Sequence, residues 1–455
     1  MVWSTPANAI SIKEEQELAR EFMKVVARRF QLIDDPLLVN YVNKVGQRIL
    51  SAVPPQPFTF HFYIIKEDVY NAFAIPAGHI FINSGLLAAL DNEDELAGLL
   101  AHEIAHVVCR HISRNIDRSK KISLATMAGV VAGIFLGAAG GDPAAMQALT
   151  VGSAAAGQTA TLAYSRQDEA QADQLGLEFL TKAGYSGKGL LLTLKKIRTK
   201  QWFGSQQVPT YMMTHPGLEN RIASIDTWMA VSKNPAPPLA YPNGSALFRK
   251  INVRLKALYE DPDTALQTFE TALAHNPNDI NMEYGFGLVL ARMGKRKEAV
   301  GYLKQALAHE ALDPVILSDL GRVYFLDGRY EEALNILEGA VSVSKVNPEG
   351  LFYLGRTRME LGQIAAAAQA FEKMLEIYAD YQPAYQFLGE AYGRLGRMPD
   401  SHYYLGLSNY RKGDFRTARY HLLRAQKGIN DPEKLETIKE TLKYIGRLPN
   451  ESGQH

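Results

Sequence analysis

Two histidines and a glutamate in the first quarter of the chain have the spacing of a metal site. His102, Glu103 and His106 form an HExxH pattern within a run, 93–111, whose leucine, alanine and isoleucine content predicts a helix. Residues four apart lie on one helix face, so the two imidazoles can bind one metal ion while Glu103 lies beside it. A glutamate in that position can take a proton from a water on the metal. The pattern therefore predicts a catalytic metal site.

The alternative interpretation is a helix that carries its histidines on a solvated polar face. Leucine, isoleucine and valine make this run largely apolar, so the polar side chains are not all expected in solvent. Buried polar groups need partners, and a metal ion supplies one. The cofactor that we expect is Zn²⁺, one ion per chain.

A catalytic zinc needs a third protein ligand and an open fourth position. The metzincin pattern would place glycine and histidine where this chain has Cys109 and Ile112, so that class is excluded. Glu169 and Asp173, four apart on a second predicted helix, offer a ligand and an acceptor for the free ring N–H of a zinc histidine. An ordinary exposed acidic face explains that spacing equally well. Two other acidic residues are weaker candidates: Asp168 and Glu178.

Motifs along the chain resemble those of the M48 zinc metallopeptidases, in the family's order, over roughly residues 15–230. The matching stretches are 71–82 with Ser84-Gly85-Leu86-Leu87, the HExxH at 102–106, Arg110-His111, Ser165-Arg166 with Glu169, Ala172 and Asp173, Thr214-His215-Pro216, and Arg221-Ile222. The resemblance implies an endopeptidase with zinc ligands His102, His106 and Glu169. It implies Glu103 as the catalytic base.

His215 is a further candidate site residue. It precedes Pro216 and would by default be an exposed turn residue, but the matching histidine of the family lies at the active site. Two roles are open: a donor that stabilises the oxyanion, or a ligand in the fourth zinc position that keeps the enzyme latent until its loop moves. We expect the latent arrangement at rest.

The elements around the motif are predicted to form a small sheet and several helices. Residues 11–53 are predicted to form amphipathic helices, 58–64 a strand and 72–83 a hairpin around Pro-Ala-Gly. Asp91-Asn92 can cap the zinc helix, with Glu95 near its N3 position. The edge of such a sheet can pair with an extended substrate, although the hairpin can also be purely structural. The candidate substrate-binding residues are Asn71, Ala72, Phe73 and Ala74.

Residues 122–141 carry no charge and place Gly129, Gly133 and Gly137 four apart. The length suits a transmembrane helix, but the glycines lower the hydrophobicity, and the segments on both sides must meet in one site. We expect a helical hairpin with residues 143–163 that makes peripheral membrane contact or covers the cleft.

A strict repeat fills the rest of the chain. Gly287, Gly321, Gly355 and Gly389 are spaced by 34, as are a second glycine series from Gly294 and an alanine series from Ala265. This is the tetratricopeptide period, which predicts a solenoid with a concave surface for proteins or peptides; a scaffold for oligomerisation is the alternative. The register slips by half a unit at 406, so one helix can serve two repeats. Three tyrosines either line the groove or pack between helices: Tyr353, Tyr385 and Tyr392.

The predicted fold class is α+β. A mostly helical metallopeptidase (gluzincin) domain with a small β-sheet spans 1–233, a proline-rich linker 234–248, an all-α tetratricopeptide solenoid 249–445 and a tail 446–455. The net charge of +1 gives no indication of nucleic-acid binding, and a single cysteine excludes intramolecular disulfides.

With its repeats, the chain resembles a periplasmic branch of the M48 family. That implies cleavage of unfolded or misassembled proteins in envelope quality control, and recruitment by the repeats to the outer-membrane barrel assembly complex. Ala7-Asn8-Ala9 looks like a signal-peptidase site, but no basic and apolar signal precedes it, so a cytoplasmic location is the alternative. Two other functions stay open: a largely latent, chaperone-like binding protein and a membrane-embedded protease.

Overall fold

The computed structural model describes residues 10–116, 124–135, 164–203, 210–231, 245–379 and 381–446. It divides into two compact units, residues 1–261 and 262–455. Each unit is described by itself.

The first unit combines a four-stranded sheet with helices. Its strands are β1 (Leu32–Ile33), β2 (His61–Ile65), β3 (Ala72–Ile75) and β4 (His79–Asn83), and the 3-10 helix η1 (Pro76–Gly78) joins β3 to β4. Its α-helices are α1 (Ile12–Arg29), α2 (Pro36–Leu50), α3 (Ser84–Ala89), α4 (Glu93–Val108), α5 (His111–Asn115), α6 (Leu124–Phe135), α9 (Arg166–Lys182), α10 (Lys188–Phe203), α11 (Thr210–Thr214), α12 (Leu218–Val231) and α13 (Ala246–Tyr259).

The sheet has the order β1-β2-β4-β3, which leaves β3 at an edge. β2 and β4 are parallel, and β3 and β4 form the antiparallel hairpin predicted over 72–83, with Phe73 opposite Phe81. The turn requires glycine at 78, because its φ is +88° and a Cβ there would lie 2.6 Å from a backbone oxygen. The predicted strand over 58–64 is found at 61–65. Within 11–53, helices α1 and α2 agree with the prediction, but the short strand β1 between them was not predicted.

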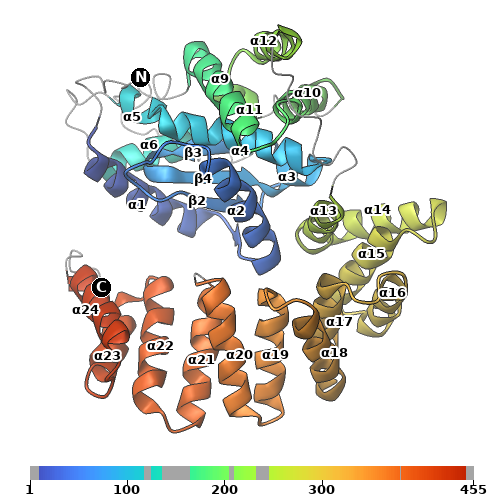
Figure 1. The fold of residues 1–455 in the computed structure, drawn as a ribbon, viewed down its shortest axis with the longest axis vertical. Helices are drawn as coiled ribbons and strands as arrows, with labels where there is room; N and C mark the ends of the chain where they lie inside the picture. Colours follow the sequence, from blue (N-terminus) through green and yellow to red (C-terminus); the bar gives the residue numbers. More distant parts are fainter. Residues whose placement is uncertain are drawn as a thin grey trace. The chain divides into compact units, whose positions relative to one another are not determined.

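Successive side chains along a strand point to opposite faces of the sheet, and β3 and β4 are buried on both faces. Phe73 and Phe81 pack on Phe22 of α1, with ring centroids 6.1 and 5.6 Å away. Figure 1 shows α4 on the opposite side of the sheet from α1. The HExxH helix is therefore fixed directly against the strands that we expected to receive substrate.

The described part of the uncharged segment is α6. Its residues Ala128, Val131 and Ala132 are buried in the core that α1 forms with the sheet. The rest of 122–141 and its expected partner, 143–163, lie outside the described residues. Among the described residues, no helix combines the length and the apolarity that crossing a membrane needs.

Helix α13 belongs to the first unit, although residues from 249 onward were predicted to belong to the repeat domain. Arg254 forms a buried ion pair with Asp35, with Nε 2.8 Å from Oδ2. The Asn252 amide lies 3.0–3.3 Å from the carbonyl oxygens of Leu87, Ala88 and Leu90 and so caps the end of α3. Residues 234–244 of the predicted linker are not described.

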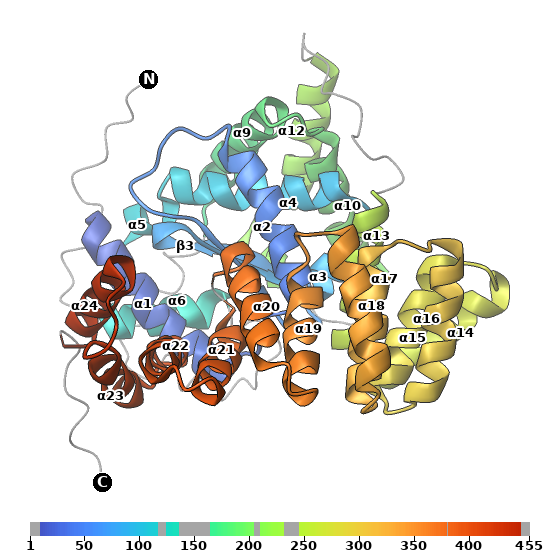
Figure 2. The same ribbon diagram turned by 60° about the horizontal axis from the view of Figure 1, so that its bottom comes forward.

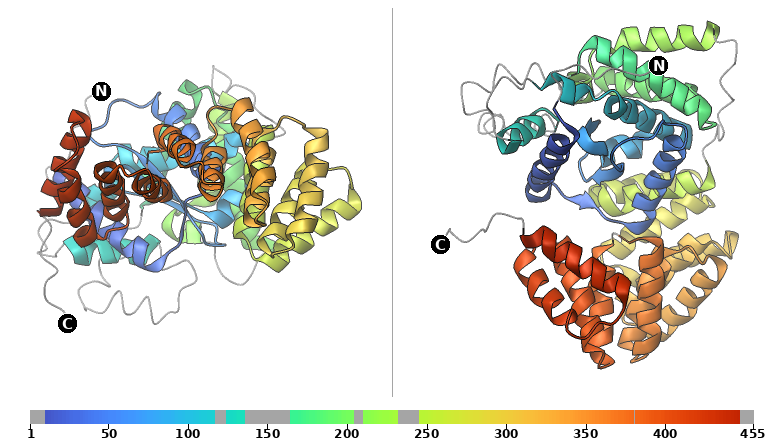
Figure 3. Two further views of the ribbon diagram at one scale, coloured as in Figure 1. Left: turned by 90° about the horizontal axis from the view of Figure 1, so that it is seen from below. Right: turned by 60° about the vertical axis from the view of Figure 1, so that its left-hand side comes forward.

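The second unit consists of helices. They are α14 (Pro262–His275), α15 (Ile280–Arg292), α16 (Arg296–His309), α17 (Pro314–Leu326), α18 (Tyr330–Val343), α19 (Pro348–Glu360), α20 (Ile364–Ile377), α21 (Gln382–Arg394), α22 (Met398–Arg411), α23 (Phe415–Ala425) and α24 (Pro432–Gly446). Figure 2 shows them in series as antiparallel neighbours, and Figure 3 shows the same succession from yellow to red.

The two glycine series have different structural roles in the repeats. The first lies where paired helices cross: a Cβ on Gly321 would lie 2.4 Å from Leu337. The second lies in the turns with positive φ, from +83° at Gly294 to +75° at Gly396. After the slip, α22 packs on both neighbours, because Gly389 of α21 meets its Leu405 and its own Gly406 meets Leu422.

The three tyrosines considered for the groove pack between helices. Tyr392 is 3% exposed and Tyr385 8% exposed, and Tyr353 stacks edge-on against Phe325 and Phe352. The predicted fold class, a small-sheet metallopeptidase domain followed by an all-α repeat solenoid, is confirmed.

Candidate metal centre

Helix α4 positions the HExxH residues. Asn92 caps its first turn, since the side chain accepts from the Glu95 backbone N–H at 3.0 Å and donates to the Glu95 carboxylate. The helix ends at Val108 rather than continuing to 111, because Arg110 adopts the left-handed conformation with φ +54°. His111 then begins α5. Both His102 and His106 point from one face of α4 into the interior.

Three histidines and one glutamate converge there. Ligand atoms of His102, His106, Glu169 and His215 all lie within 4.8 Å of one another. Nε2 of His102 is 3.0 Å from Nε2 of His106 and 3.4 Å from Nδ1 of His215. Oε1 of Glu169 is 3.3 Å from His106 Nε2 and 3.0 Å from His215 Nδ1. The structure thus joins four residues from three separate stretches of the chain.

A second layer of contacts holds the histidine rings. Asp173 Oδ1 lies 2.9 Å from Nδ1 of His102, which leaves Nε2 directed at the cluster. His111 Nδ1 lies 2.8 Å from Nδ1 of His106 and plays the same part for that ring. The other nitrogen of His111 lies 3.0 Å from Gln171 Oε1. Such partners fix the orientation and tautomer of metal-binding histidines.

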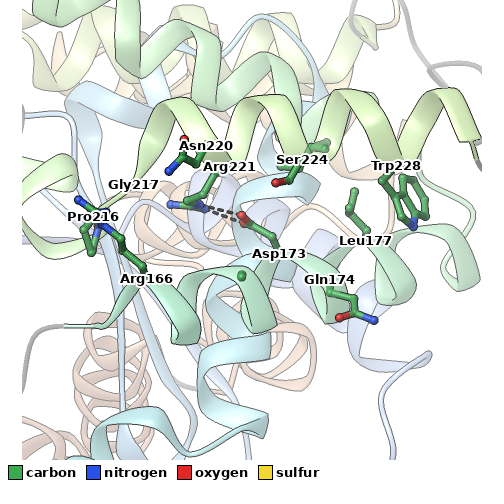
Figure 4. A pocket seen from close by; sticks show the side chains of 12 residues that line it. Arg166, Asp173, Gln174, Leu177, Pro216, Gly217, Asn220, Arg221, Ser224 and Trp228 are labelled. Carbon is green, nitrogen blue, oxygen red and sulfur yellow. Dashed lines mark hydrogen bonds and ion pairs between the residues drawn. The ribbon is translucent and has the colours of Figure 1, made fainter.

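Arg221 of α12 connects both acidic residues of α9. It donates from Nε and Nη2 to the two oxygens of Asp173, each at 2.7 Å, and its Nη1 forms an ion pair with Glu169. Figure 4 shows the pair of Arg221 with Asp173, which lines a cavity between α9 and α12. The volume of this cavity is about 400 Å³. Arg221 thereby fixes the predicted ligand, Glu169, and the predicted acceptor, Asp173, relative to each other.

Glu103 lies beside the cluster. Its Oε1 lies 3.7 Å from His215 Nε2, and neither carboxylate oxygen has a hydrogen-bond partner among the described residues. Burial raises the pKa of Glu103. A buried carboxylate left without donors is suited to accept a proton rather than to stabilise structure.

His215 contributes both ring nitrogens to the centre. Nδ1 belongs to the cluster, and Nε2 lies 3.3 Å from the carbonyl oxygen of Ala72 on β3. Its ring stacks on Tyr211 of α11, with centroids 4.2 Å apart and planes 13° apart. Of the two roles considered for His215, this placement has the arrangement of a fourth ligand.

Aromatic residues cover the centre. Tyr164 stacks on His106 with centroids 3.6 Å apart, and its hydroxyl donates to the Ala74 carbonyl at 3.1 Å. The four clustered residues and Glu103 are at most 2% exposed. The structure is therefore a closed state of the site.

The pKa values of the cluster residues depend on burial and on the partners of each group. Burial alone would raise the pKa of Glu169, but Arg221 and His215 hold it well below its usual range. Burial would lower the pKa of His102, but its hydrogen bonds to Asp173 and Glu169 raise it to about 9. For His106 burial outweighs the hydrogen bond to Glu169, and its pKa lies well below the usual value.

The donor set fits a transition-metal ion. Ligands 2.0–2.1 Å from a tetrahedral zinc lie about 3.3 Å apart, close to the 3.0–3.4 Å between neighbouring cluster atoms. Imidazole nitrogens with one carboxylate suit zinc rather than calcium or magnesium, which prefer oxygen. His102, His106 and Glu169 would hold the ion, with His215 at the remaining position.

The remaining residues that were considered for the site lie outside the four-residue cluster. Asp168 caps α9 through Ser165, and Glu178 is exposed and paired with Lys182, so neither weaker candidate joins the cluster. Asn71–Ala74 lie at and beside β3, within reach of His215 and Tyr164.

Four contributors were not predicted as site residues: His111, Arg221, Tyr164 and Tyr211. For Arg221 a signal existed, because it shares the apolar face of α12 with Leu218, Ile222 and Ile225. A cation at the i+3 position of an apolar stripe is expected to have a buried partner. No comparable pattern identified the two tyrosines.

Comparisons with known proteins support the resemblance that the motifs indicated. Residues 36–229 match the model of peptidase family M48, and 290–349 and 349–381 match tetratricopeptide repeat models. The chain therefore carries an M48 peptidase domain followed by tetratricopeptide repeats, as the motifs predicted.

Among curated proteins, the chain is similar to the beta-barrel assembly-enhancing protease of Escherichia coli K12, with 28% identity over 220 residues. That match covers 48% of this chain and 45% of the relative, so the chain spans about half of its length. The Yersinia pestis protein of that name is 29% identical, covering 47% and 43% of the two chains. The mitochondrial metalloendopeptidase OMA1 of Schizosaccharomyces pombe is 26% identical, covering 49% and 63%.

Among solved structures, a crystal structure of MamA is 22% identical with a TM-score of 0.32, covering 34% of this chain and 90% of that chain.

Proposed function

We propose that this chain, an M48 peptidase domain followed by tetratricopeptide repeats, is a zinc-dependent endopeptidase that cleaves unfolded or misassembled proteins. The observation that carries the proposal is the buried cluster of three histidines and one glutamate with Glu103 beside it. A purely structural metal site would not need a carboxylate without hydrogen-bond partners next to the ligands.

The chemistry divides between a metal ion and the protein. When bound to His102, His106 and Glu169, zinc would supply Lewis acidity toward a water molecule and a scissile carbonyl. Glu103 accepts the proton of the attacking water, which its raised pKa favours, and then passes that proton to the leaving amine. Asp173 and His111 keep the rings of His102 and His106 oriented throughout.

An extended substrate would bind along β3. The strand is at the sheet edge and lies beside the cluster, because His215 and Tyr164 reach its carbonyl groups. Main-chain pairing with an edge strand requires an extended, unfolded segment and tolerates varied side chains. This supports unfolded polypeptides as the substrate class.

The closed site supports a second candidate function. With His215 in the cluster and every ligand buried, the resting protein would be a latent protease whose repeats bind clients in a chaperone-like way. Proteolysis would then follow only after His215 leaves. We favour a gated protease over a protein without proteolytic activity, because Glu103 is present and correctly placed.

We further propose that the protein is periplasmic and that its repeat unit binds it to the outer-membrane barrel assembly complex. The relatives named as beta-barrel assembly-enhancing proteases support this proposal. Stacked repeats commonly dock extended segments of other proteins.

The decisive experiment is cleavage of an unfolded outer-membrane barrel protein by the purified chain, with zinc measured by elemental analysis. Glu103→Gln should retain about one zinc per chain and lose cleavage. Glu169→Ala should lose most of the zinc. The matched control is Glu178→Ala, on the same helix, which removes an exposed carboxylate and should retain both zinc and cleavage. Full cleavage by Glu103→Gln would refute the assignment of the base, and normal zinc in Glu169→Ala would refute the third ligand.

A further inference from the structure

Among the described strands β3 lies at the sheet edge, and a strand that paired with it would use the peptide groups on its outer side. The backbone N–H of Asn83 donates to the Asn71 carbonyl at 3.0 Å, so residues 71, 73 and 75 face β4. In an antiparallel pair the hydrogen-bonding direction alternates along the strand. The peptide groups of Ala72 and Ala74 therefore point outward, away from β4.

Both outward carbonyl oxygens are already hydrogen-bonded in the closed state. His215 Nε2 lies 3.3 Å from the oxygen of Ala72, and the Tyr164 hydroxyl lies 3.1 Å from the oxygen of Ala74. The two contacts come from different parts of the chain: Tyr164 lies just before α9, and His215 follows α11. Two side chains thus occupy the acceptors that a substrate strand would use.

The contact to Ala72 also fixes the tautomer of His215. A carbonyl oxygen only accepts, so Nε2 must carry the proton. Nδ1 then presents its lone pair to the cluster, where it lies 3.0 Å from Glu169. Ala72 thereby acts on His215 as Asp173 acts on His102: it orients the ring as a ligand.

We propose that the edge of β3 couples substrate binding to release of the latch, with Tyr164 as a positioning residue that closes the edge. A substrate strand can use the Ala72 and Ala74 oxygens only by displacing His215 and Tyr164. Displacement from Ala72 removes the acceptor that holds His215 in its ligand form. An extended client would thus open the site by pairing with it. This inference rests on the proposed function, because it assumes that β3 receives substrate.

Tyr164 is suited to this role by its two contacts. Its ring lies against His106, and only its hydroxyl reaches Ala74. Phenylalanine at 164 would keep the stacking and free one edge acceptor. The consequence should be tighter strand binding rather than slower chemistry.

The test measures strand binding without cleavage. In the full-length, zinc-loaded chain carrying Glu103→Gln, Tyr164→Phe should tighten binding of a short fluorescent peptide of alternating valine and threonine. The affinity should increase about threefold to tenfold, which corresponds to the net contribution of one hydrogen bond. The control is Tyr63→Phe, which removes a hydroxyl on β2 that contacts His79, and it should leave the affinity unchanged. Unchanged or weaker binding in folded Tyr164→Phe protein would overturn the proposal.

A second measurement leaves the protein intact. Two versions of the same peptide are compared, each methylated on a different alternate set of backbone nitrogens. A methylated nitrogen cannot donate a hydrogen bond, so the version methylated on the side that faces β3 should bind about tenfold or more weakly. The other version should bind normally. In the cobalt-substituted chain, the unmethylated peptide should also change the visible absorption of the metal as His215 leaves. Equal binding of both registers, or a spectrum that the bound peptide does not change, would contradict the coupling. Register-dependent binding by a chain that cleaves nothing would instead leave the edge assignment intact and refute only the endopeptidase function.

Discussion

The guanidinium of Arg221 forms a bidentate pair with the carboxylate of Asp173, with both N–O distances at 2.7 Å and both side chains buried. Asp173 in turn orients His102, and the third nitrogen of Arg221 pairs with Glu169. One cation on α12 therefore supports a candidate ligand and the partner of another. The loss of this cation should affect both folding and metal binding.

Arg221→Ala should destabilise the first unit by about 3–5 kcal/mol, because it leaves two buried carboxylates without their cation. Chemical denaturation followed by circular dichroism measures that loss, and elemental analysis should find less zinc than in the unaltered chain. Arg198→Ala serves as the control, since it breaks only a surface pair with Glu219 and should cost under about 1 kcal/mol. A stable, fully metallated Arg221→Ala protein would show that Asp173 and Glu169 do not depend on this residue.

A second prediction concerns acid stability and lies away from the metal centre. Burial, with a contribution from His61, lowers the pKa of His79 to about 4, against about 6.5 in the unfolded chain. Between these values the unfolded chain binds the extra proton, so His79 favours unfolding increasingly as the pH falls from 6.5 to 4. Its contribution to the free energy of unfolding across that range is at most about 3 kcal/mol.

His79→Gln should accordingly flatten the dependence of stability on pH between 6.5 and 4. Urea denaturation at several pH values provides the measurement. The exposed His275→Gln should leave the slope of the first unit unchanged. An equally steep slope in His79→Gln would assign the acid sensitivity to other groups.

The parts of the site that lie within one helix could be predicted from the sequence. His102 and His106, and Glu169 and Asp173, face one way because helix geometry is local and places residues four apart together. The 34-residue period likewise predicted the helical repeat solenoid, since each repeat mainly contacts its neighbours. These predictions needed no knowledge of which distant segments meet.

Contacts between distant segments could not be predicted in this way. The apolar stripe on α12 indicated a buried Arg221 but not its partner 48 residues earlier. The end of α4 was missed because Arg110, not a glycine, adopts the left-handed conformation. The position of α13 depends on Arg254 meeting Asp35, 219 residues away, a relationship that no local pattern contains.

Helix α13 yields a third prediction. Asp35 caps α2 by accepting from the backbone N–H groups of Leu37 and Leu38, and Arg254 neutralises it. Arg254→Ala should therefore cost about 3–5 kcal/mol in the unfolding of the first unit. The substitution Lys256→Ala, at a partly buried position on the same helix, should cost far less.

By the same reasoning, a fragment ending at residue 261 should resist urea better than one ending at 235. Equal stability of the two fragments would mean that α13 adds nothing to the fold.

The last prediction separates the two roles of His215. In the closed state its Nδ1 lies with the ligand atoms of His102, His106 and Glu169, and all four side chains are buried. A residue that acts there as a fourth ligand competes with water for the position that catalysis needs, so its removal should raise activity rather than lower it.

His215→Ala should therefore keep about one zinc per chain, lose one nitrogen from the metal coordination in X-ray absorption spectra, and increase basal cleavage, including self-cleavage. The double variant with Glu103→Gln should show the same spectral change without self-cleavage, which separates unlatching from proteolysis. An oxyanion donor makes the opposite prediction: turnover should fall about a hundredfold or more while the resting coordination is unchanged. That outcome would exclude the latch and assign His215 to the transition state, because a donor acts only on charge that develops during the reaction.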